Sequence, residues 1–106
     1  MKYPVTQHTT YTVMNLSGEI DLNESPTLRK QILKYINNND DLLIDLSNVE
    51  YIDSSGVASL VEGLQTARTK KINFALVGVS DSALQVLQLA RLDSVFTLYE
   101  SLEDVE

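Results

Sequence analysis

The sequence predicts an α/β fold in which a mostly parallel β-sheet carries helices packed on it. Residues 42–46 form an apolar run, interrupted only by Asp45, that is typical of a strand buried on both faces of a sheet. Residues 54–69 repeat apolar side chains at the helical spacing i, i+3, i+4, i+7. Strand-like and helix-like stretches then alternate along the chain, which indicates right-handed crossovers between parallel strands.

Length and composition exclude several classes of protein. The 106 residues suit one compact domain, so we expect residues 1–106 to fold as a single unit. The net charge of −7 argues against binding to nucleic acid or to an anionic membrane surface. With no Cys and one His, the chain has little material for a disulfide, a metal site or a cofactor, and we expect none. No signal-peptide core and no membrane-spanning run are present, which predicts a cytoplasmic protein.

The first half of the chain predicts a hairpin, a helix and the central strand. Strands over residues 3–8 and 10–17 would turn around Thr9 and Thr10, with Gly18 ending the second. Asn23 or Ser25 would cap a helix that ends before the polar residues 37–41. Its expected apolar face consists of Leu28, Ile32, Tyr35 and Ile36. The strand over residues 42–46 would end in a turn at Ser47 and Asn48, and residues 49–52 would lead to the next helix.

The second half predicts two further strands and two helices. The helix over residues 54–69 ends in basic residues that suit a helix C-terminus, namely Arg68, Lys70 and Lys71. A strand over residues 72–77 is closed by Gly78. Ser80 or Asp81 would cap a third helix. The buried face of that helix is expected to hold Leu84, Leu87 and either Ala90 or Arg91. A strand over residues 95–99 and a turn of helix within 101–106 complete the order β-β-α-β-α-β-α-β.

The candidate site is the sequence Asp-Ser-Ser-Gly at residues 53–56, where the central strand gives way to a helix. The N-terminus of a helix has free N–H groups and a partial positive charge, so it tolerates a phosphate. Phosphorylation of Ser54 would add about −1.5 to −2 charges to any interface formed there. Asp, Ser and Gly are also ordinary capping residues, so a purely structural role is the alternative. Ser55 is the second candidate acceptor and suits a structural cap better.

Catalytic and metal-binding interpretations find little support. A nucleophilic serine needs a base within hydrogen-bond reach. His8 lies in the opening strand or its turn, and Lys70 and Lys71 lie at the far end of the helix that Ser54 begins. Carboxylates that could suggest a cation site are Asp40, Asp41, Asp45 and Asp53. Such residues are more often turn formers and solvated side chains.

The order of elements and three motifs resemble those of STAS domains, and above all the small bacterial anti-sigma factor antagonists (anti-anti-sigma factors). The motifs are residues 53–56 after Tyr51 and Ile52, the Ser-Gly-Glu-Ile-Asp segment at 17–21, and the Val-Gly-Val-Ser segment at 77–80. The resemblance covers residues 5–99. It implies a STAS-type sheet and a protein that regulates transcription by partner switching.

The resemblance also implies partners and a site. The unmodified protein would bind an anti-sigma factor that is a serine kinase, which frees a sigma factor. The kinase would phosphorylate Ser54 and end the binding, and a serine phosphatase would restore it. The expected partner-binding residues are Glu19, Asp21, Asp53, Ser54, Ser55, Gly56 and, on the exposed face of the second helix, Ser59, Glu62 and Gly63.

One departure from the family pattern keeps a second function open. Family members commonly continue Gly-Leu-Gly after the two serines, whereas this chain has Gly56, Val57 and Ala58. STAS subunits of phospholipid-trafficking ABC transporters tolerate variation at this point. The alternative is therefore an accessory subunit whose same surface contacts the transporter ATPase without phosphorylation. Neither function makes the chain an enzyme.

Overall fold

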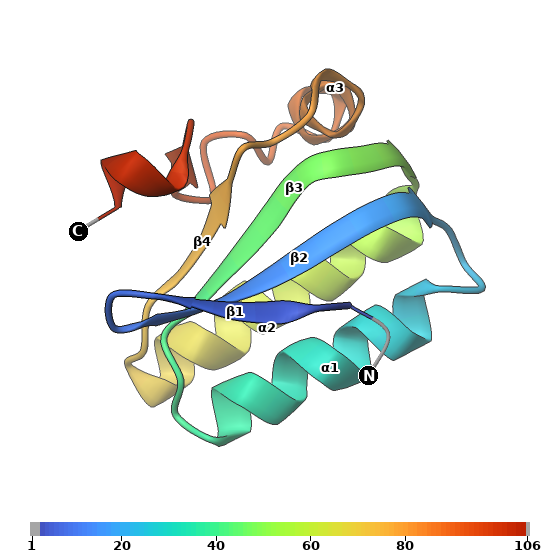
Figure 1. Ribbon diagram of the computed structural model, residues 1–106. Coiled ribbons are helices and arrows are strands. Elements are labelled where there is room, and N and C mark those ends of the chain that lie inside the picture. The colour runs from blue at the N-terminus through green and yellow to red at the C-terminus, as the bar shows by residue number, and fades with distance from the viewer. Residues whose placement is uncertain (1–2, 106) are drawn as a thin grey trace.

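A five-stranded sheet forms the centre of the molecule in the computed structural model, which describes residues 3–105 (Figure 1). The strands lie in chain order and are β1 (Val5–His8), β2 (Tyr11–Ile20), β3 (Leu42–Ile52), β4 (Phe74–Val77) and β5 (Leu98–Tyr99). β1 pairs with β2 antiparallel, and every later pair is parallel. The predicted fold class and element order are confirmed.

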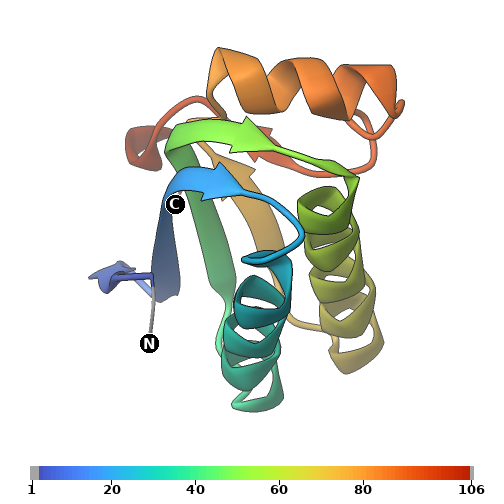
Figure 2. The same ribbon diagram turned by 90° about the vertical axis from the view of Figure 1, so that its right-hand side faces the viewer.

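Three helices accompany the sheet. Helices α1 (Ser25–Asn37) and α2 (Ser54–Lys70) lie side by side on one face, as Figure 2 shows. Helix α3 (Asp81–Leu89) lies across the carboxyl end of β3, and a short 3₁₀ helix spans Leu102–Asp104 (Figures 1 and 2). None of the helices within residues 3–105 is long and apolar enough to cross a bilayer.

Both faces of the central strands are buried, as the apolar run at residues 42–46 predicts. Ile44 points to the face that α1 and α2 cover, and it has no exposed surface. Leu43 points to the other face, where it packs with Val13, Val77 and the C-terminal Val105. Alternate residues of one strand therefore enter two separate apolar clusters.

The structure corrects the expected end of the central strand. No turn forms at Ser47 and Asn48, because β3 continues to Ile52. Register shifts against β2 place one extra residue of β3 between Asp45 and Asn48 and another between Val49 and Tyr51. The Asp45 carboxylate accepts hydrogen bonds from the N–H (2.8 Å) and the hydroxyl (2.7 Å) of Ser47, so turn-forming residues stabilise a bulge instead of a chain reversal.

The hairpin is confirmed, but two boundaries near it differ from the prediction. Gly18 does not end β2, which continues to Ile20, and its φ of +76° lies at one of the register shifts. Neither Asn23 nor Ser25 caps α1. Asp21 lies further upstream, and its carboxylate accepts the backbone N–H groups of Asn23 (3.0 Å) and Glu24 (3.2 Å).

The end of the chain is less regular than predicted. Helix α3 begins at the expected Ser80 cap, but it buries Ala83 and Leu87, while Ala90 and Arg91 are exposed. The helix is only nine residues long and lies at the end of the sheet, so only a narrow stripe reaches the core. β5 has two residues in place of the five predicted at 95–99, because it pairs with only the last two residues of the short strand β4.

Candidate functional site: the start of helix α2

Asp53 caps helix α2 where β3 ends. Its backbone is extended, and its Oδ1 accepts the backbone N–H groups of Ser55 (2.9 Å) and Gly56 (3.2 Å). Two N–H groups that would otherwise lack a partner are thereby satisfied. A Cβ added to Gly56 would lie 2.7 Å from Ile52 and 2.8 Å from Ile20, so the first turn sits directly on the ends of β2 and β3.

The two serines at this helix start have different environments. The Ser55 hydroxyl donates a 2.5 Å hydrogen bond to Asp53 Oδ1, and the residue is half-buried. The Ser54 side chain is exposed, and its hydroxyl has no hydrogen-bond partner within residues 3–105. Ser55 is therefore part of the cap, whereas Ser54 is accessible to another protein.

The cap changes the acidity of Asp53. The hydrogen bond from the Ser55 hydroxyl, together with the N–H groups of Gly56, Ser55 and Leu22, holds the pKa of the Asp53 carboxyl below its ordinary value, against a smaller effect of desolvation. The helix N-terminus therefore already has an anionic partner. A phosphate on Ser54 would lie beside this carboxylate and would not find the Ser55 and Gly56 N–H groups free.

This depressed pKa predicts a pH-dependent contribution to stability. A carboxyl whose pKa is lower in the folded state stabilises the fold fully above its unfolded pKa of about 3.9, and the contribution is lost as the pH falls through the folded value. We expect Asp53→Asn to lower the denaturation midpoint at pH 7, and the difference from wild type to shrink at about pH 3. Urea unfolding at the two pH values measures it. An equal difference at both would contradict the assignment.

The structure brings the loop after β2 next to the start of α2. Ile20 and Ile52 are register neighbours, and the Asp53 N–H donates to the Ile20 carbonyl (3.2 Å). Asp21 therefore lies beside Asp53, although its carboxylate is occupied at the start of α1. Glu19 is exposed and precedes the buried Ile20, so it points to the opposite face of the sheet.

The predicted exposed face of α2 is wrong at two positions. Ser59 is only 6% exposed, and its hydroxyl donates to the carbonyls of Ser25 (3.3 Å) and Ser55 (3.1 Å). Gly63 is buried, and a Cβ there would lie 2.7 Å from Ile32. Both residues face α1, which packs along this side of the helix. They position α2 and are not available to a partner.

Glu62 is partly exposed but is engaged within the molecule. Arg29 of α1 donates to both of its carboxylate oxygens through Nε (2.8 and 2.9 Å), and Nη2 lies 2.7 Å from Oε2. This ion pair lowers the pKa of Glu62, chiefly through the hydrogen bond from Arg29. Glu62 therefore joins α1 to α2 at the edge of the surface that Ser54 occupies.

A base or a metal site near Ser54 is not found within residues 3–105. His8 pairs with Tyr11 in the hairpin, and Tyr11 lies nine residues before Ile20 along β2, a separation of roughly 25–30 Å. Lys70 lies sixteen residues along α2, about 24 Å away. No three acidic or His side chains of these residues gather as a metal site would require.

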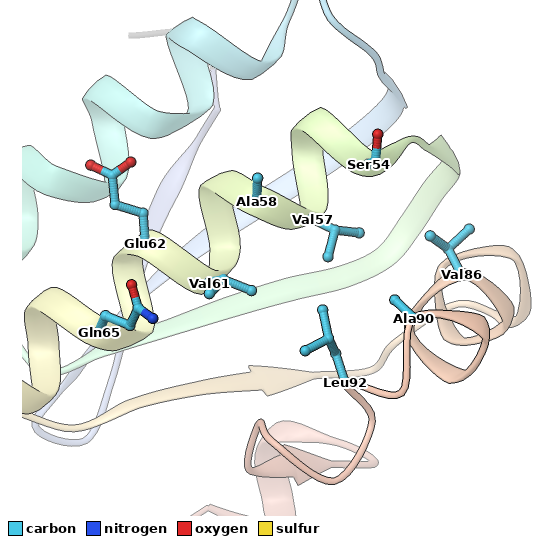
Figure 3. Close-up of a pocket in the computed structure, with 9 residues that line it drawn as sticks. All are labelled: Ser54, Val57, Ala58, Val61, Glu62, Gln65, Val86, Ala90 and Leu92. Atoms are coloured by element: carbon cyan, nitrogen blue, oxygen red, sulfur yellow. The ribbon is translucent and has the colours of Figure 1, made fainter.

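The sequence did not predict the groove that Ser54 borders. This groove lies between α2 and α3 and has a volume of about 780 Å³. Figure 3 shows Val57 and Val61 of α2 directed toward Val86 and Leu92 on the α3 side, with Ser54 at one end. Val86 and Leu89 both lie beside the predicted apolar stripe of their helix, and of these two only Val86 lines the groove.

An exposed serine hydroxyl beside the carboxylate that caps the helix suits binding or modification by another protein. The sequence profile of the STAS domain family matches residues 2–105. Anti-sigma-F factor antagonist RsfB of Mycobacterium tuberculosis is 30% identical over 101 residues, which cover 94% of this chain and 82% of that protein.

Solved structures give the same result. The crystal structure of an anti-sigma factor antagonist from Mycobacterium paratuberculosis has 31% identity and a TM-score of 0.87, covering 97% of this chain and 88% of that one. The phosphorylated form of the Bacillus cell fate determinant SpoIIAA has 18% identity and a TM-score of 0.74, covering 96% and 94%, and shares the fold. The chain belongs to the STAS domain family and, within it, to the anti-sigma factor antagonists, which are non-catalytic regulators.

Proposed function

We propose that this protein binds an anti-sigma factor with serine kinase activity, releases a sigma factor, and loses that binding when Ser54 is phosphorylated. The observation that carries the proposal is a contrast between two hydroxyls. That of Ser54 is exposed and has no hydrogen-bond partner among residues 3–105, whereas that of Ser55 donates to Asp53. The proposed acceptor can reach a kinase without unfolding the cap. The relatives named as anti-sigma factor antagonists favour this function over a transporter subunit.

The modification is a transfer of the γ-phosphoryl group of ATP to Ser54 Oγ. The new P–O bond replaces the bond to ADP, the hydroxyl proton is released, and a serine phosphatase reverses the change by hydrolysis. The phosphate would stand beside the Asp53 carboxylate on a chain of net charge −7. Repulsion between the phosphate and nearby carboxylates, and the cost of removing water from the phosphate, would then weaken binding of a partner that covers the start of α2. The fold itself is kept, because Asp53 still caps the helix.

Phosphorylation by a cytoplasmic anti-sigma kinase from the same organism tests the proposal. We expect incubation with the kinase and MgATP to add one phosphate to the wild type and to Ser55→Ala, and none to Ser54→Ala. Intact-mass and fragment mass spectrometry locate the group. Phosphorylation of Ser54→Ala, or none of the wild type by any such kinase, would refute the assignment. The second result would leave the transporter ATPase as the partner to test.

A further inference from the structure

The groove between α2 and α3 has the composition of a binding surface. Six of its nine lining residues are apolar, and the full set is Ser54, Val57, Ala58, Val61, Glu62, Gln65, Val86, Ala90 and Leu92. Val61, Val86 and Leu92 pack on the core yet remain only half-buried, and Ala58 and Ala90 are exposed. The groove therefore leaves apolar surface that the described chain does not cover.

The length of the groove suits a helix. Its α2 wall runs from Ser54 to Gln65, twelve residues that span about 17 Å, which is roughly three helical turns. Apolar side chains at successive turns of α2 face those of the α3 side across the gap (Figure 3). An amphipathic helix presents apolar residues at the same i, i+3, i+4, i+7 spacing, which is how helices dock in apolar grooves.

The two ends of the groove differ in charge. The Ser54 end adjoins the Asp53 carboxylate. At the other end Arg68, three residues beyond Gln65, donates from Nη2 to the carbonyl of Val95 (3.5 Å) and so joins α2 to the segment after α3. An occupant that suits these ends carries no negative charge against Ser54 and is acidic toward Arg68.

We propose that the groove between α2 and α3 receives the apolar face of an amphipathic helix of the anti-sigma kinase, with an acidic residue at the Arg68 end. This inference rests on the proposed function and extends it, because Ser54 is itself a groove residue. A phosphate there would place a dianion at the mouth of an apolar interface, where it would be desolvated beside Asp53. Phosphorylation therefore closes the groove to the helix.

Two adjacent residues give a matched test. Ala90→Trp fills the groove, whereas Leu89→Trp places the same indole side chain beside it, at a position that is 86% exposed and outside the lining. Using the kinase that phosphorylates Ser54, we expect Ala90→Trp to raise Kd by about tenfold or more and Leu89→Trp to change it less than about twofold. Calorimetric titration measures both, and unchanged thermal unfolding shows that both variants fold.

Charge reversal and amide exchange complete the test. We expect Arg68→Glu to weaken binding more than Lys70→Glu, an exposed position two residues further along α2. Residues 81–89 of α3 should gain protection from exchange in the complex. Wild-type affinity for Ala90→Trp, or no protection of α3, would refute the groove even if Ser54→Asp fails to bind. If no anti-sigma kinase binds the wild type, the proposed function fails and this inference with it.

Discussion

We expect Ser54→Asp to weaken binding to the anti-sigma kinase by on the order of 100-fold while leaving the fold intact. A carboxylate placed in an apolar interface beside Asp53 costs about 3 kcal/mol, which corresponds to that factor. The fold should not change, because the Ser54 side chain is exposed and its hydroxyl makes no hydrogen bond within residues 3–105. Calorimetric titration gives the affinity, and thermal unfolding reports the fold.

Two controls isolate the position and the charge. Ser54→Ala should bind like the wild type and should remain bound after incubation with MgATP, since it lacks the acceptor hydroxyl. Ser82→Asp adds the same charge to an exposed position in the first turn of α3, outside the groove, and should bind like the wild type. Equal affinities of Ser54→Asp and the wild type would show that charge at this helix start does not control binding.

Leu60→Ala should produce the largest loss of stability among simple truncations of α2. Leu60 has no exposed surface and packs in the cluster between the helices and the sheet. Removing its three terminal carbon atoms loses their transfer free energy and leaves a cavity, at a cost of about 2–5 kcal/mol in the free energy of unfolding. Urea unfolding followed by circular dichroism measures the change.

Leu89→Ala is the matched control for this truncation. The exchange is chemically the same and also occurs in a helix, but Leu89 is 86% exposed. We expect the free energy of unfolding to change by no more than about 0.5 kcal/mol. Similar losses of stability for the two variants would mean that burial in the core does not explain the effect of Leu60→Ala.

Much of the fold follows from patterns that act over a few residues. The spacing of Val57, Leu60 and Leu64 predicts α2, and the carboxylate of Asp53 completes its N-terminus. The hairpin at Thr9 and Thr10 forms as expected, with Thr9 at a φ of 54°. Such features depend on backbone geometry and on residues that are close together in the chain. The sequence alone is therefore sufficient to predict them.

The errors occur where a distant segment decides the outcome. Ser47 and Asn48 favour a turn by themselves, but pairing with β2 keeps them in strand β3. The strand accommodates them with β-bulges instead of a chain reversal. Ser59 and Gly63 appear on the polar side of α2 in the sequence, yet α1 covers that side. Helix periodicity identifies an apolar face but does not reveal which neighbouring helix will cover the remaining faces.

The sequence by itself determined the α/β class, the helix that starts at Ser54, and Ser54 as the candidate acceptor. Only the tertiary structure decided that the Ser54 side chain is exposed at the end of a groove, and that Glu62 is paired with Arg29. It also created the groove, in which Val61 of α2 and Val86 of α3 remain half-buried. The physical reason is that exposure and pairing depend on packing between segments far apart in the chain, whereas capping and periodicity are local.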